Sequence, residues 1–215
     1  KCDPILDFHA WNPFPFHRKR DFGNCSVVYR DMEKLPYVTT LWLGENFDYE
    51  AASPEYYLTE LSGLPFGLTG EMLRSGGNLW RGILFGMTSR YGWLGDPRSL
   101  WRFFDAFGLD GLRIESDFDT PPLKMSDPRI RAARFSNARG KKLLVLASWC
   151  PEKTSIAFPE DWTAPEISGF QRPADYPAGT PVPLEPGKGV ILAPGGTEEK
   201  PAERNLKWNI GGTFV

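Results

Sequence analysis

Short apolar runs alternate with amphipathic segments over the first 108 residues of the chain. Strands are predicted at 5–9 and at 38–44, the second because β-branched and aromatic side chains dominate it. A third, shorter strand is predicted at 64–68. The first two runs become polar toward their carboxyl ends, through 7–12 and 45–49. Strands that alternate with helices predict parallel pairing through helical crossovers.

Capping residues mark the predicted helices of this region. A cap residue or a proline at the first helical position marks the starts, and a glycine or, for the first helix, Pro36 marks the ends. Leu100, Trp101, Phe104 and Phe107 are expected on one face of the last helix. The predicted helices cover 25–34, 54–61, 78–90 with Asn78 as cap, and a segment that begins at Asp96-Pro97 and ends at Gly108.

Beyond Gly108 the pattern changes to short strands separated by Pro/Gly turns, which predicts a β-sandwich. The clearest signal is a hairpin with arms at 130–135 and 142–149. Further strands are predicted at 112–115, 154–158, 166–170, 182–184 and 189–192.

The predicted fold class is therefore α/β plus all-β. Residues 1–108 are interpreted as the C-terminal part of a (β/α)8 barrel, 109–194 as a small β-sandwich and 195–215 as a tail or linker. A closed barrel needs eight strands, whereas only two or three are predicted here. The N-terminal remainder of the barrel is expected in the same precursor or in a separate chain.

Composition narrows the classes of partner. The 215 residues carry a net charge of −2, so nucleic acid is not an expected partner. No apolar stretch reaches the roughly 18 residues of a membrane span. Aromatic residues make up 14% of the chain, and they serve either as core or as flat platforms for sugar rings.

Cysteine and histidine usage predicts neither a metal site nor a cofactor. The three cysteines lack metal-ligand spacing, and there are only two histidines. Asn24-Cys25-Ser26 fits the glycosylation acceptor pattern, which favours an extracellular or secretory location. In that location Cys2–Cys25 is the first disulfide to test. The start at Lys1 is interpreted as that of a processed, trimmed or partial product.

Several blocks resemble glycoside hydrolase family 123-like proteins, in the right order, over about residues 5–192. The blocks are Asp-Phe-His at 7–9, Leu-Trp-Leu-Gly-Glu-Asn-Phe-Asp-Tyr at 41–49, Leu-Pro-Phe-Gly-Leu at 64–68, Gly-Gly-Asn-Leu-Trp-Arg-Gly at 76–82, Phe-Gly-Met-Thr at 85–88, Trp-Arg-Phe-Phe-Asp-Ala-Phe-Gly at 101–108 and Leu-Val-Leu-Ala-Ser-Trp at 144–149.

The resemblance implies a (β/α) barrel followed by a β-sandwich, and removal of N-acetylgalactosamine from glycans. In such proteins the substrate's own acetamide acts as nucleophile, assisted by an adjacent Asp-Glu pair, a departure from the usual two-carboxylate scheme. No Asp-Glu dipeptide occurs in these 215 residues. The catalytic acid pair is therefore expected outside this chain.

Functional groups of a barrel lie at the carboxyl ends of its strands. Carboxylates and a histidine there suit acid/base work or hydroxyl binding, aromatic rings suit stacking on sugars, and an arginine suits an anionic sugar group. The alternatives are a buried ion pair for a carboxylate, core packing for Trp42 and an ion pair within the barrel for Arg81. The candidate substrate-binding residues are Asp7, His9, Trp11, Trp42, Glu45, Tyr49 and Arg81.

Two functions stay open at this point. The first is a glycoside-hydrolase-like protein whose pocket is completed by an N-terminal segment. The second is a non-catalytic glycan-binding or structural protein on the same fold, since a fold alone does not establish catalysis.

Overall fold

The computed structural model describes residues 78–89, 96–116 and 125–195, the strands at 7–9, 40–43 and 69–72, and the single residues 37 and 54. Side chains are described at 37, 54, 78–87, 96–116 and 125–195. Within this part of the chain, no helix has the length and apolar composition needed to cross a membrane. The predicted tail after 195, the predicted helices at 25–34 and 54–61 and the predicted strand at 64–68 lie outside the described residues, apart from Pro54.

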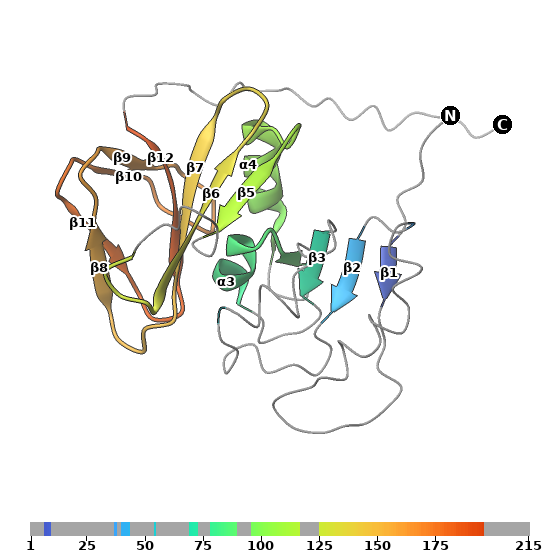
Figure 1. Cartoon of the computed structure of the whole chain (residues 1–215), viewed down its shortest axis with the longest axis horizontal. Helices are drawn as coiled ribbons and strands as arrows, with labels where there is room; N and C mark the ends of the chain where they lie inside the picture. The colour runs from blue at the N-terminus through green and yellow to red at the C-terminus, as the bar shows by residue number, and fades with distance from the viewer. Residues whose placement is uncertain are drawn as a thin grey trace.

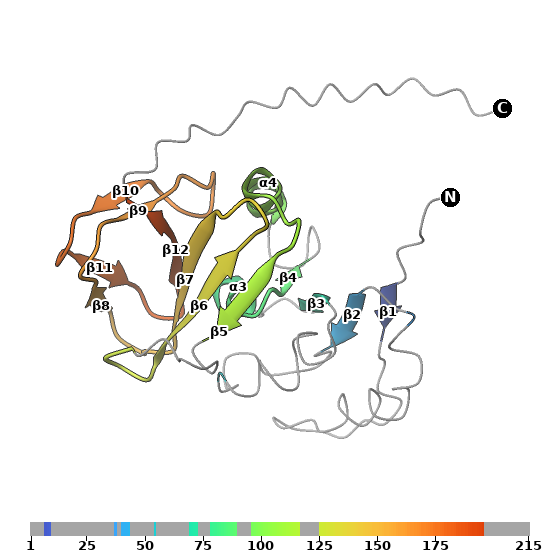
Figure 2. The ribbon, with the colours of Figure 1, turned by 45° about the horizontal axis from the view of Figure 1, so that its top comes forward.

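Four short strands of the first part pair in chain order, and all three pairings are parallel. Figure 1 shows the first three strands side by side, and Figure 2 shows the fourth beyond them. This confirms the strands predicted at 5–9 and 38–44 and their parallel direction. The strands are β1 (Asp7–His9), β2 (Thr40–Leu43), β3 (Thr69–Met72) and β4 (Thr88–Ser89).

Helix α3 (Leu79–Leu84) begins at the predicted cap, because the Asn78 side chain accepts a hydrogen bond from the Arg81 backbone N–H at 3.1 Å. The prediction that this helix continues to residue 90 is wrong. Gly86 has a φ of 70°, a left-handed conformation that ends the helix, and β4 begins at Thr88.

Helix α4 (Arg98–Phe107) follows the Asp96-Pro97 signal as predicted. Gly108 ends it with a φ of 92°, and its N–H donates to the Phe104 carbonyl at 2.9 Å. Leu100, Phe104 and Phe107 are buried, whereas Trp101 is 36% exposed. The expectation that Trp101 shares the buried face is therefore wrong, because a neighbouring position is rotated about 100° around the helix axis.

The rest of the described chain is antiparallel. One sheet has the order β10-β9-β12-β7-β6-β5, and a second sheet pairs β11 with β8. The predicted hairpin is confirmed as β6 and β7. The strands are β5 (Arg113–Ser116), β6 (Ile130–Ser136), β7 (Lys142–Ser148), β8 (Thr154–Ala157), β9 (Trp162–Ala164), β10 (Ala174–Tyr176), β11 (Pro181–Leu184) and β12 (Gly189–Pro194).

The strand predicted at 166–170 is wrong. This segment is a tight turn in which Ile167 bridges Gln171, and Gly169 provides a left-handed φ of 71°. The two strands that flank it, β9 and β10, were not predicted. Each is only three residues long, too short to show a clear two-residue period.

Strand β7 lies at the centre of the core because both of its faces are apolar. Leu143, Val145 and Ala147 belong to one hydrophobic cluster, together with side chains from α3 and α4. Leu144 and Leu146 belong to a second cluster, together with β8 and β11. The six-stranded sheet is therefore covered by helices on one face and by the two-stranded sheet on the other (Figures 1 and 2).

Asn137 fastens the β6–β7 hairpin to the end of α4. It is 8% exposed, and its amide nitrogen donates to the carbonyl oxygens of Phe107 (2.7 Å) and Gly108 (3.0 Å). Its side-chain oxygen accepts from the backbone N–H groups of Arg139 (3.0 Å) and Lys141 (3.1 Å). One buried side chain thus satisfies groups at a helix terminus and a hairpin turn together.

Asn137→Asp should destabilise the protein by about 2–4 kcal/mol, because the carboxylate keeps both acceptor bonds but faces two carbonyl oxygens without a donor. Urea unfolding at pH 7 measures the change. Arg139→Gln, at an exposed position of the same turn, is the control and should shift the free energy of unfolding by less than about 0.5 kcal/mol. Equal stability of Asn137→Asp and the unmodified protein would contradict the role of the amide.

Candidate functional site

The predicted site residues of β1 and β2 lie on adjacent parallel strands. Asp7 is in register with Thr40, and His9 is in register with Trp42. Because parallel strands end at the same edge of a sheet, the carboxyl ends of β1 and β2 lie together. Asp7, His9 and Trp42 are therefore brought to one region of the sheet.

Strand periodicity assigns these residues to one face. Alternate residues of a strand belong to the same face, and paired residues of neighbouring strands share it. We call this set of positions the polar face, since it combines acidic, imidazole, indole and hydroxyl-bearing residues. Its members are Asp7, His9, Thr40, Trp42, Thr69, Glu71 and Thr88, and the opposite face has Phe8, Leu41, Leu43, Gly70, Met72 and Ser89.

Glu71 is the one acidic member of this face that was not among the predicted site residues. It pairs with Trp42 on one side and Thr88 on the other. The segment Thr69–Met72 contains a glycine and one large apolar residue, so its pattern does not predict a strand. No local pattern marks Glu71, because only the pairing of β3 with β2 and β4 places it on this face.

The other predicted residues of this region are not placed. Trp11, Glu45, Tyr49, the Asn24 acceptor and the cysteines at 2 and 25 lie outside the described residues. No group of three or more histidine, cysteine or acidic side chains suited to a metal ion occurs among the residues whose side chains are described.

Arg81 lies at the junction between α3 and the six-stranded sheet. Its side chain is 5% exposed, and its guanidinium carbon lies 4.9 Å from the ring centre of Trp149, within range of a cation–π interaction. Both residues line an open cavity of about 470 Å³. The described lining residues are Asn78, Arg81, Trp149, Cys150, Pro151, Pro186, Gly187 and Lys188.

Two further contacts hold this junction together. The Asn78 amide nitrogen donates to the Gly187 carbonyl oxygen at 2.8 Å, which ties the start of α3 to the turn before β12. The ring centres of Trp80 and Phe170 lie 4.4 Å apart. Together with the contact between Arg81 and Trp149, these contacts join helix α3 of the first part to the antiparallel second part.

Arg81→Met should lower the free energy of unfolding by about 1–3 kcal/mol, because methionine fills much of the volume but loses the charged contact with Trp149. Thermal and urea unfolding measure the change. Arg102→Met, on the exposed face of α4, is the matched control and should be nearly neutral. Loss of glycan binding at unchanged stability would instead assign Arg81 to ligand recognition.

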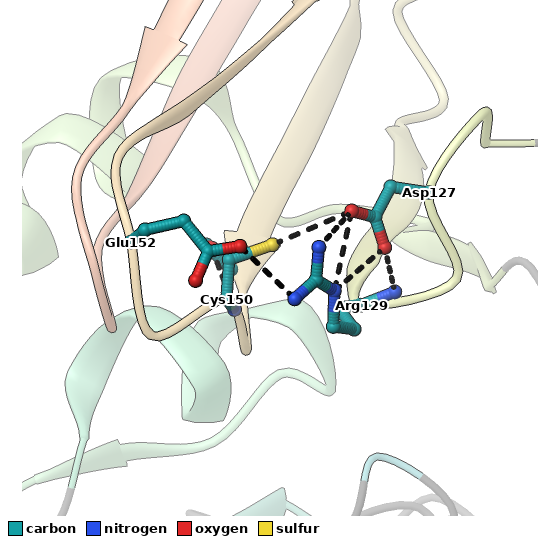
Figure 3. A network of polar contacts seen from close by, with 5 residues as sticks. Asp127, Arg129, Cys150 and Glu152 are labelled. Carbon is teal, nitrogen blue, oxygen red and sulfur yellow. Dashed lines mark hydrogen bonds and ion pairs between the residues drawn. The ribbon is translucent and has the colours of Figure 1, made fainter.

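An ion-pair network borders the cavity at Cys150 (Figure 3). The Arg129 guanidinium donates to the Asp127 carboxylate at 2.8 Å and to Glu152 at 3.1 Å. The Cys150 thiol is buried, with its sulfur 3.7 Å from Asp127 Oδ2. Hydrogen bonds from the Arg129 side chain, followed by its backbone N–H, lower the pKa of Asp127 from 3.8 to about 2.

Asp127 should make the protein more acid-sensitive between about pH 4 and pH 2. Because the folded-state pKa lies below the unfolded-state value, this carboxylate contributes stability above pH 4 and loses that contribution as the pH falls through about 2. Asp127→Asn should therefore flatten the dependence of unfolding free energy on pH in that window. Urea titrations at several pH values test this, with Asp110→Asn, whose side chain is 86% exposed, as control; an unchanged slope in Asp127→Asn contradicts the coupling.

Two family models match the chain. Residues 1–92 match the model described as glycoside hydrolase 123, TIM-barrel domain. Residues 96–194 match the model described as glycoside hydrolase 123, C-terminal domain. Comparison with curated proteins and with solved structures found no match. The division after Gly108 stays a prediction, although α4 falls within the second matched range and packs on the antiparallel sheet.

Proposed function

We propose that this chain, which is a glycoside hydrolase family 123-like protein, forms one wall of a sugar-binding pocket in a hydrolase that acts on N-acetylhexosamine-containing glycans. The observation that carries the proposal is the polar face of the parallel sheet. Asp7 and His9 are alternate residues of β1, and Trp42 lies in register beside His9. This combination suits a sugar, whose hydroxyls need polar partners and whose ring needs an apolar plane.

The proposed architecture is the C-terminal part of a (β/α)8 barrel followed by a β-sandwich. The four described strands β1–β4 are mutually parallel and adjacent in chain order, as successive strands of a barrel are. The apolar face that contains Leu41 and Leu43 suits contact with an outer layer of helices. The polar face then belongs to the interior of the barrel, where its strand ends open to substrate.

The proposed roles follow from side-chain chemistry. Asp7 and Glu45 accept hydrogen bonds from sugar hydroxyls, and His9 donates to a hydroxyl or orients a carboxylate. Trp42, Trp11 and Tyr49 provide stacking surfaces. The adjacent Asp-Glu pair that would assist the acetamide nucleophile is absent from these 215 residues, so the proton-transfer groups belong to the part of the barrel outside them.

The proposed partners are the N-terminal remainder of the barrel and a glycan. The proposed location is extracellular or within the secretory pathway, supported by the Asn24-Cys25-Ser26 acceptor triplet. A protein that binds glycans without hydrolysing them is the second candidate. It is favoured by the same absence of an Asp-Glu dipeptide from the sequence in hand.

Asp7→Asn in the full-length protein should lower kcat/KM on 4-nitrophenyl N-acetylhexosaminides by roughly 10–100-fold, the effect of losing a charged hydrogen bond. Release of nitrophenol is the measurement, and Asp110→Asn is the control at an exposed carboxylate. Wild-type activity in Asp7→Asn would remove Asp7 from the pocket. Binding of N-acetylhexosamine glycans without hydrolysis by the unmodified protein would favour the second candidate.

A further inference from the structure

A tight turn forms one wall of the open cavity of about 470 Å³ at Arg81, which we call the junction cavity. The turn runs from Glu185 to Lys188, and the Lys188 N–H donates to the Glu185 carbonyl oxygen at 3.0 Å. Gly187 supplies the left-handed φ of 63° that such a turn requires. The Ser148 N–H donates to the Lys188 carbonyl oxygen at 2.8 Å, so the turn is fixed beside the end of β7.

Two cationic side chains from different elements line the junction cavity. Arg81 belongs to α3, and Lys188 belongs to the turn. A Cβ atom added at Gly187 would lie 4.0 Å from Arg81 Nη2, so the guanidinium end of Arg81 approaches this same turn. The guanidinium carbon also lies 4.9 Å from the ring centre of Trp149, which orients its planar set of donors. None of the described lining residues is acidic.

Three carboxylates near the lining residues have cationic partners of their own. Arg129 donates to the carboxylates of Asp127 and Glu152, at 2.8 and 3.1 Å (Figure 3). Glu185 pairs with Lys153 at 2.7 Å. Because each of these negative charges is paired, the described surroundings of the cavity keep the positive charge of the two lining cations.

We propose that the junction cavity binds a sugar acid, whose carboxylate contacts Arg81 and Lys188 and whose ring lies against Trp149. A guanidinium donates two parallel hydrogen bonds to a carboxylate, and an ammonium adds a second positive charge. Because Arg81 is 5% exposed, its charge acts where water screens it weakly. Trp149, Pro151 and Pro186 provide an apolar surface for the carbon-bound hydrogens of a sugar ring. The cavity volume lies within the roughly 300–1,000 Å³ of small-molecule sites.

Binding of methyl hexuronides to the full-length protein tests this proposal, which adds a binding site to the polar face and requires no hydrolysis. The probes are the methyl glycosides of glucuronic, galacturonic and mannuronic acid, each compared by calorimetry with the neutral hexoside of the same configuration. At least one acid should bind with a Kd roughly 10-fold or more below that of its neutral counterpart, because it alone offers a charged acceptor. Sodium acetate, which has the carboxylate without the ring, should bind more weakly than that acid.

Two substitutions locate the site. Lys188→Met should raise the Kd of the hexuronide by roughly 3-fold or more, because one exposed positive charge is lost. Arg81→Met should remove most of the preference for the acid over the neutral sugar. Lys142→Met is the matched control, since it makes the same change of charge at an exposed lysine that begins β7, whereas the cavity lies beyond the other end of that strand.

Each outcome decides the proposal. Equal affinity for every hexuronide and its neutral counterpart overturns it, and so does unchanged affinity in Lys188→Met. Acetate that binds as tightly as the best hexuronide also overturns it, since the cavity would then hold an anion without recognising a sugar. An equal loss of affinity in Lys188→Met and Lys142→Met would indicate attraction by net charge alone and likewise contradicts the site. If thermal unfolding shows that Arg81→Met does not fold, Lys188→Met still decides the location. Hydrolysis of a 4-nitrophenyl N-acetylhexosaminide by the same preparation reports separately on the proposed function.

Discussion

The burial of β7 on both faces is the constraint on which the described structure depends. Leu143 to Ser148 are six consecutive buried residues, so the central strand needs an apolar layer above and below. The β8–β11 pair provides one layer. The other layer comes from α3 and α4, which precede the antiparallel strands in the chain. The second part of the chain therefore completes its core with helices that follow the parallel strands, and the two parts share one hydrophobic cluster.

This shared cluster also determines how closely α3 approaches the sheet. A side chain at Gly189 would collide with the Leu146 carbonyl oxygen and lie 3.0 Å from Trp80 Cε3, so only glycine permits this packing of α3 against β12 and β7. At the other end of the same junction, Asn78 holds the turn at Gly187. Since α3 also contacts β4, the junction fixes the edge of the parallel sheet relative to the antiparallel one.

Capping residues and apolar runs predicted the helices and strands whose boundaries depend on neighbouring residues in the sequence. The α4 boundaries follow from Asp96-Pro97 and Gly108, and the β6–β7 hairpin follows from two long apolar arms around a polar loop. The alternation before Gly108 predicted parallel strands, and the described part shows four. Strands β3, β4, β9 and β10 were not predicted, because none of them belongs to an apolar run like those at 5–9 and 38–44, and pairing with neighbours decides their conformation.

The sequence predicted those residues of the candidate site that a local run marks, and it did not predict the residue that strand pairing places there. Asp7 and His9 were identified because they end an apolar run, whereas Glu71 emerges only from the register with Trp42, a pairing that no local pattern encodes. The contact between Arg81 and Trp149 was not predictable from local sequence either, since the packing of α3 on the antiparallel sheet creates it. The polar face and the Arg81 junction therefore arise from different interactions. The polar face is defined by the register of four parallel strands, whereas the apolar cluster around α3 stabilises the fold by removing large side chains from water.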